Sequence, residues 1–136
     1  MELYVQNHKI IFQTESLEET LHKLAESNCK IPKPKSDKEF RILRIGRRRN
    51  QDAIIYSIPN NKDENQHYEK GITFSEFRKA LIELQANGCI TRDWFNKNLQ
   101  ECASEGTCNF TSLCGILELL GYCEYTGRGK YEVLKK

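Results

Sequence analysis

The chain has 136 residues, of which 38% are hydrophobic and 29% charged, and its net charge is +2. This balance is typical of a soluble chain and shows no obvious sign of disorder, and the hydrophobic runs are too short for a membrane-spanning helix. The length predicts one domain or two very small ones. The N-terminus lacks the pattern of a signal peptide, so we expect a cytoplasmic protein with no membrane partner.

The first half of the chain predicts a small unit of strands with one helix. Short strands are expected at residues 3–5 and 10–12. A capping box of Ser16 and Glu19 then predicts a helix that ends near Asn28.

Irregular structure and a hairpin follow this helix. Pro32 and Pro34 exclude regular structure over residues 30–35, because proline lacks a backbone donor and restricts the residue before it. Strands are expected at residues 40–45 and 53–58. The connection between them, residues 46–52, places three consecutive arginines at or beside a hairpin tip.

Basic residues are concentrated in residues 30–49. This segment holds nine Lys or Arg and two Asp or Glu, a net charge of +7, so the rest of the chain sums to −5. Such asymmetry attracts polyanions. The phosphate-binding residues predicted here are Arg41, Arg44, Arg47, Arg48 and Arg49. The alternative is a solvated hairpin whose charges protect a sheet edge.

Residues 59–70 are polar, and their length predicts a loop or linker between two units. The expected organisation is a small α+β unit over residues 1–58 and a second unit over residues 71–136. The fold class is therefore α+β.

The second unit has sharper signals. A capping box of Thr73 and Glu76 begins a helix that Gly88 ends. After a brief extended piece, Thr91 caps a second helix that runs through residue 99. A turn at residues 103–106 leads to a third helix, residues 107–120. A two-stranded hairpin with Gly127, Arg128 and Gly129 at its tip closes the chain.

The order helix, short strand, helix, turn, helix, hairpin resembles the winged helix-turn-helix superfamily over residues 71–136. The resemblance implies a nucleic-acid-binding protein, with double-stranded DNA as the partner and a role as a small transcription regulator or accessory subunit. In DNA-binding winged helices the third helix enters the major groove and the hairpin, or wing, contacts the backbone. Carried over to this chain, the expected contacts are Arg92, Asn109, Thr111, Ser112, Arg128 and Lys130.

The third helix departs from this pattern because it contains no Lys or Arg between residues 107 and 120. Arg–guanine pairing is the commonest specific base contact, so a third helix without Arg or Lys favours backbone binding over base readout. It also favours an alternative, a protein-interaction or dimerisation module in which Ile116 and Leu119 point off the core face and form a docking surface.

No catalytic, metal or cofactor signature is present, so we expect a protein that is not an enzyme and needs no cofactor. The six cysteines lack zinc-ligand spacing and are expected to be reduced core residues. A weak alternative is a metal or acid–base site at His67 with Asp63, Glu64 and Glu69.

Overall fold

A computed structural model describes the backbone of residues 4–6, 9–11, 14–35, 38–59 and 67–134. Within these residues the fold is mixed α+β, as the sequence predicts, with five helices and three antiparallel sheets. None of the helices described is long and apolar enough to cross a membrane.

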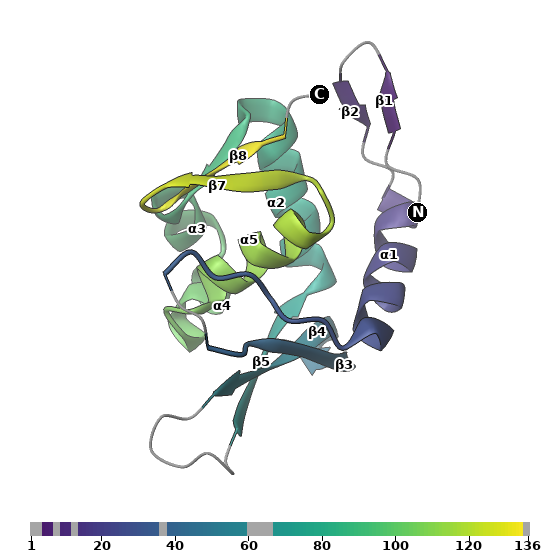
Figure 1. Cartoon of the computed structure of the whole chain (residues 1–136), viewed down its shortest axis with the longest axis vertical. Helices are drawn as coiled ribbons and strands as arrows, with labels where there is room; N and C mark the ends of the chain where they lie inside the picture. The colour runs from purple at the N-terminus through teal and green to yellow at the C-terminus, as the bar shows by residue number, and fades with distance from the viewer. Residues whose placement is uncertain (1–3, 7–8, 12–13, 36–37, 60–66, 135–136) are drawn as a thin grey trace.

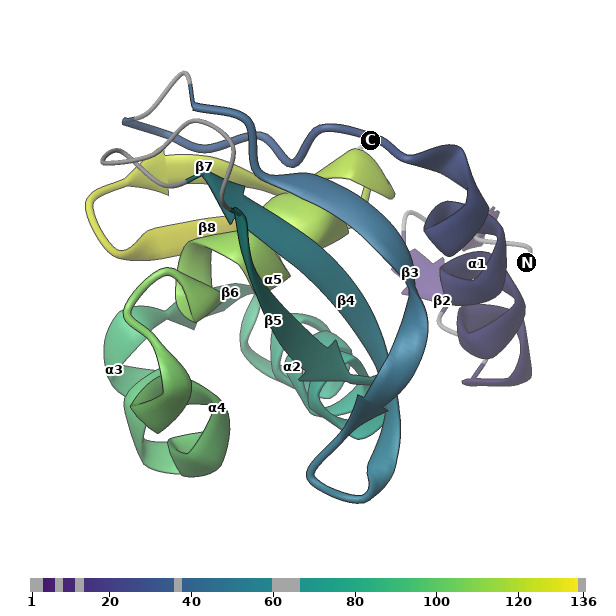
Figure 2. The same ribbon diagram turned by 90° about the horizontal axis from the view of Figure 1, so that it is seen from below.

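The N-terminal elements form a hairpin, a helix and a three-stranded sheet (Figure 1). Strands β1 and β2 pair only with each other, and β4 lies between β3 and β5. Figure 2 shows this sheet along one side of the molecule, with α2 and α5 behind it and α1 beyond β3. The bounds are β1 Tyr4–Gln6, β2 Lys9–Ile11, α1 Thr14–Ser27, β3 Arg41–Arg48, β4 Gln51–Pro59 and β5 His67–Thr73.

Two boundaries here differ from the predictions. Helix α1 begins at Thr14, so Ser16 lies inside the helix and is not its N-cap. Strand β5 includes residues 67–70, which were predicted to belong to a polar linker. The polar side chains of this stretch hide a strand whose pairing with β4 extends from Ala53↔Thr73 to Pro59↔His67.

The C-terminal elements are α2 Phe74–Asn87, β6 Cys89–Thr91, α3 Arg92–Asn98, α4 Gln100–Glu105, α5 Asn109–Leu119, β7 Cys123–Gly127 and β8 Lys130–Val133. The predicted capping box of Thr73 and Glu76 is present with both hydrogen bonds, and Gly88 ends α2 at φ 77°. The Thr91 side chain caps α3 as predicted. Helix α4 was not predicted, because residues 103–106 were read as a turn.

The sheet at the C-terminus has the order β6-β8-β7, so the first of its strands pairs with the last. In the chain, β6 lies between α2 and α3, and the β7–β8 hairpin follows α5. We call this hairpin the wing. Its tip contains Gly129 at φ 71°.

Both halves of the chain share one hydrophobic core. A single cluster of buried residues joins α1, the β3–β4–β5 sheet, α2, α5 and the wing. Leu21, Ile54, Phe77 and Leu117 of this cluster each have an exposed fraction of 0%. The predicted units at residues 1–58 and 71–136 are therefore packed against each other.

Residues 30–35, here called the proline segment, cross α5 (Figure 1). The Ile31 side chain is fully buried, and a Cβ on Gly115 of α5 would lie 2.5 Å from the Pro32 carbonyl oxygen. Only glycine at position 115 allows so close an approach. The proline segment therefore covers part of the helix that was predicted to read bases.

Candidate nucleic-acid interface

Three of the predicted hairpin arginines form ion pairs with nearby carboxylates. Arg44 contacts Glu69 at 2.6 Å, Arg47 contacts Asp52 at 2.9 Å, and Arg41 contacts Glu39 at 3.2 Å. The hydrogen bond from Arg44 lowers the pKa of the Glu69 carboxyl, which keeps that partner ionised. The charge excess of residues 30–49 is therefore offset locally.

Arg49 is turned into the protein rather than toward solvent. It donates to both Glu76 carboxylate oxygens, at 2.9 and 2.6 Å, and to the Gly71 carbonyl oxygen at 3.0 Å. Glu105 lies 2.6 Å from its Nη1. Burial opposes the charged form, but the hydrogen bonds that Arg49 donates to Glu76 and Glu105 outweigh it and raise the pKa of Arg49. Arg49 joins the hairpin to α2 and α4.

Arg48 follows the surface of the sheet. Its Nη1 donates to the Arg47 carbonyl oxygen at 2.8 Å, and its stem lies over Gly71, where a Cβ would come within 2.6 Å of the Arg48 Cγ. Its side chain is half-buried, so Arg48 offers less free charge than its position beside a hairpin tip suggests.

Two of the residues predicted on the third helix lie in the core. Asn109 accepts a hydrogen bond from the Tyr56 hydroxyl and donates to the Cys102 carbonyl oxygen at 2.8 Å. Ser112 accepts from Lys33 Nζ at 2.6 Å. Both have an exposed fraction of 0%. The expected base contacts of Asn109 and Ser112 do not fit these positions, because their polar atoms are occupied and buried.

Ile116 also differs from its predicted position. It is fully buried, whereas Leu119 is 40% exposed. The face of α5 that was expected to be free for docking therefore retains Leu119 but not Ile116.

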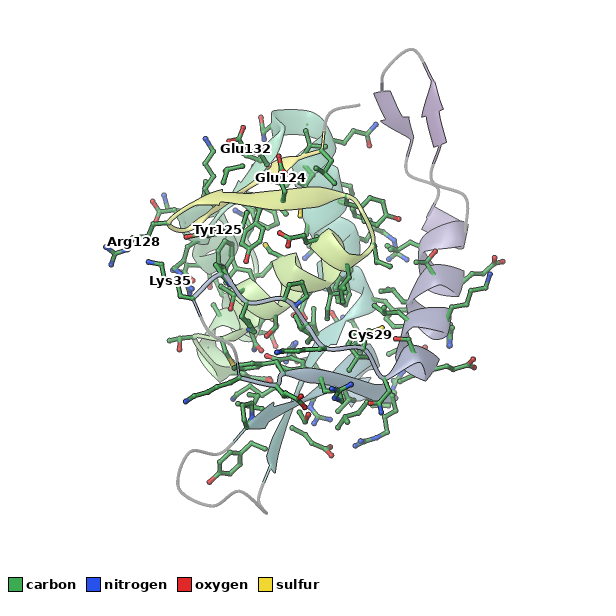
Figure 3. All side chains as sticks on the ribbon, viewed as in Figure 1. Cys29, Lys35, Glu124, Tyr125, Arg128 and Glu132 are labelled. Atoms are coloured by element: carbon green, nitrogen blue, oxygen red, sulfur yellow. The ribbon has the colours of Figure 1, made fainter. Side chains whose placement is uncertain are left out.

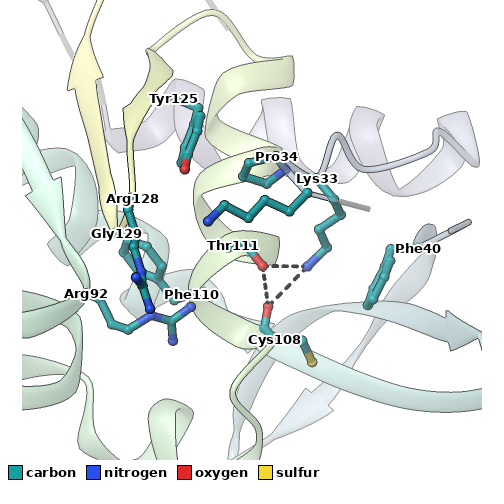
Figure 4. A pocket seen from close by; sticks show the side chains of 11 residues that line it. Lys33, Pro34, Phe40, Arg92, Cys108, Phe110, Thr111, Tyr125, Arg128 and Gly129 are labelled. Atoms are coloured by element: carbon teal, nitrogen blue, oxygen red, sulfur yellow. Dashed lines mark hydrogen bonds between the residues drawn. The ribbon is translucent and has the colours of Figure 1, made fainter. Parts of the chain in front are cut away.

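A pocket of about 650 Å³ opens between the proline segment, the start of α5 and the wing (Figure 4). Its lining includes three predicted residues, Arg92, Thr111 and Arg128. The remaining lining residues are Lys33, Pro34, Lys35, Phe40, Cys108, Phe110, Tyr125 and Gly129. Lys33 and Lys35 belong to the basic segment of residues 30–49. Among the described residues, four of the lining side chains are basic and none is acidic.

Lys33 forms the floor of the pocket. Its ammonium group donates to the Cys108 carbonyl oxygen at 3.2 Å and to the hydroxyls of Thr111 and Ser112 at 2.9 and 2.6 Å. It also lies 4.1 Å from the centre of the Phe40 ring. Burial is the main cause that lowers the pKa of Lys33 to about 8. Lys33 is thus still charged at neutral pH and holds the proline segment to α5.

The cations at the pocket rim are less engaged. Lys35 and Arg128 lie close together at the tip of the wing (Figure 3), and neither has an ion pair or hydrogen bond to another described residue. Glu124 and Glu132 are cross-strand neighbours on β7 and β8, and Figure 3 shows them away from Lys35 and Arg128. Within the part of the chain that the structure describes, the rim therefore presents positive charge without a neutralising carboxylate.

Arg92 joins the rim to the aromatic core. Its guanidinium lies 4.8 Å from the centre of the Phe110 ring and donates to the Thr107 carbonyl oxygen at 3.2 Å. Lys130, the remaining predicted residue, does not line the pocket, and its Nζ lies 4.0 Å from Glu132.

Sequence reasoning missed most of this pocket because its residues come from separate segments. Lys33 and Lys35 were counted in the basic stretch, but nothing local indicated that they meet Arg128, about ninety positions later in the chain. The two prolines beside these lysines are the sequence signal for the pocket. They favour an extended segment, whose side chains can pack against another part of the protein.

The described residues contain no group of His, Cys, Asp and Glu that could hold a metal ion. All six cysteines are free, and burial raises the pKa of the Cys102, Cys114 and Cys123 thiols. Asp63, Glu64 and the His67 side chain, proposed above as a weak metal or acid–base site, lie outside the described residues.

No protein-family model, curated protein or solved structure matches this chain.

Proposed function

We propose that residues 71–134 form a winged helix and that the protein binds nucleic acid through the face made by the wing and the proline segment. The order α2, β6, α3, α5, β7, β8 and the pairing of β6 with β8 support the winged-helix assignment. The additional helix α4 lies between the second and third helices of this pattern.

The proposed contacts differ from those of a major-groove reader. The proline segment covers part of helix α5, and the side chains of Asn109 and Ser112 in its first turn are buried inside the protein. Helix α5 also lacks cations. Binding therefore depends on phosphate contacts, which supply most of the sequence-independent affinity for nucleic acid.

The observation that carries the proposal is the cluster of Lys35, Arg92 and Arg128 around a pocket that no described carboxylate lines. Lys35 and Arg128 have no ion pair or hydrogen bond to another described residue, so they remain available to release counterions from a phosphate backbone. Arg92 is held beside them by Thr107 and the Phe110 ring. Phe40 and Tyr125 add aromatic surface beside them, which is typical of nucleic-acid sites. Duplex DNA, and a role as a small regulator or accessory subunit, are the expectations from the winged-helix resemblance.

The direct test is fluorescence anisotropy with labelled duplex and single-stranded oligonucleotides at about 50 and about 200 mM salt. We expect binding at the lower concentration and a slope of about −2 to −4 in a plot of log K against log salt, as two to four phosphate contacts require. Absence of binding to every oligonucleotide at the lower salt concentration would refute the proposal.

A protein-interaction module is the second candidate. With Ile116 buried, its support reduces to the exposed side chains of Leu119 and, on α2, Ile82. Light scattering after size exclusion distinguishes the two: a dimer that Leu119→Glu dissociates, together with no nucleic-acid binding, would favour this candidate.

A further inference from the structure

The aromatic residues of the pocket belong to a continuous row of rings. Phe95, Phe110, Tyr131 and Tyr125 follow one another in edge-to-face contacts with centroid distances of 5.5, 5.7 and 5.3 Å. The first three are 1% exposed, whereas Tyr125 is half-buried and lines the pocket. The Tyr125 ring is therefore held in place by the core and has surface free for a ligand.

A second half-buried ring, Phe40, lines the same pocket from the residue just before β3, with the Lys33 ammonium over one of its faces. Figure 4 shows Phe40 and Tyr125 on different sides of the pocket, with Lys33 between them. Every nucleobase has a flat face that stacks on such rings. Cationic side chains beside the rings bind the phosphates attached to the stacked nucleotide. Lys35 and Arg128 lie at the rim, where those phosphates would lie.

The size of the pocket agrees with this ligand. Its volume of about 650 Å³ lies inside the range of roughly 300–1,000 Å³ for small-molecule sites. A single nucleotide fits this range. A duplex cannot place a base there without breaking a base pair, which costs a few kcal/mol.

The polar groups of the floor are already used. The Thr111 hydroxyl and the Cys108 carbonyl oxygen both accept from Lys33, and Thr111 Oγ1 also donates to Cys108. Few groups remain to read the edge of a base. Stacking without edge contacts tolerates any base, so little sequence preference is expected.

We infer that the pocket holds one unstacked nucleotide of a single strand, with its base beside Tyr125 and its phosphates at Lys35 and Arg128. This inference rests on the proposed nucleic-acid binding and makes single strands, or unpaired ends, the preferred form over an intact duplex.

The test compares Tyr125→Leu with the wild-type protein on a fluorescein-labelled oligothymidylate and on a blunt hairpin duplex. Loss of one stacking partner should weaken single-strand binding about tenfold and change duplex binding less than about twofold. Tyr68→Leu is the matched control, because Tyr68 is an aromatic residue 60% exposed on β5 and does not line the pocket.

Thermal melting establishes whether each variant folds. If Tyr125→Leu does not fold, Phe40→Leu is used in its place. Thymidine monophosphate as competitor tests whether the site needs a strand. No displacement at low concentration is expected, and displacement there would overturn the assignment to a strand in favour of a site for free nucleotides. Tighter duplex binding with no effect of Tyr125→Leu or Phe40→Leu would overturn the inference and leave nucleic-acid binding in place. No binding of any kind would overturn both.

Discussion

The β3–β4 hairpin and the pocket beside the wing are both rich in cations, but their charges are used differently. Arg44, Arg47 and Arg49 of the hairpin meet the carboxylates of Glu69, Asp52 and Glu76. At the pocket, Lys35 and Arg128 have no such partner among the described residues. The charge of a sequence segment thus differs from the charge its folded surface presents, because partners distant in sequence cancel part of it.

The largest effect in this comparison is expected for Arg49→Ala. The side chains of Arg49 and Glu76 are each 10% exposed, and removal of one member of a buried ion pair costs about 3–5 kcal/mol. Urea denaturation should show this loss in the free energy of unfolding, while the folded fraction retains its affinity for nucleic acid.

Arg47→Ala is the matched control in the same hairpin. Arg47 and Asp52 are 65% and 54% exposed, and an exposed pair contributes about 1 kcal/mol or less. Equal stability of the two variants would contradict the structural role of Arg49. If Arg49→Ala folds stably but loses nucleic-acid binding, Arg49 contacts the nucleic acid directly.

Asn109→Ala should have the next largest effect. It removes the strongest hydrogen-bond partner of the Tyr56 hydroxyl, which keeps only a 3.5 Å contact with Cys108 Sγ, and it removes the donor to the Cys102 carbonyl oxygen. A buried polar group left unpaired costs about 1–3 kcal/mol. Adding Tyr56→Phe to this variant removes one of those unpaired groups, so the double variant should recover part of the lost stability in the same denaturation assay. Reduced binding by Asn109→Ala with unchanged stability would instead support base contact by Asn109.

Features set by neighbouring residues could be predicted from the sequence. The Thr73 and Glu76 capping box, the Gly88 terminus of α2 and the Thr91 cap depend on contacts within four residues, and all three are present. The arginine hairpin was also located correctly, although its turn is a tight one in which Arg49 and Asn50 both have positive φ.

Features set by distant residues could not be predicted. Strand β5 is polar and gains its stability from pairing with β4 and from Arg44, so its own composition resembles a loop. The burial of Asn109 depends on Tyr56, more than fifty positions earlier. The pocket likewise requires the proline segment to lie across α5. The contact of Ile31 and Pro32 with Gly115 that fixes this arrangement exists only in the folded chain.

The most direct test of the central claim compares two double variants that each remove two positive charges, Lys35→Ala/Arg128→Ala and Arg44→Ala/Arg47→Ala. Their affinities for a labelled oligonucleotide are measured by anisotropy across a salt series. If the pocket rim supplies the free cations, the first variant should lower affinity at least tenfold and reduce the salt slope by about 2. The second should change affinity less than about threefold, because its arginines are already paired. Equal losses, or a larger loss in the hairpin variant, would contradict the assignment of binding to the pocket face.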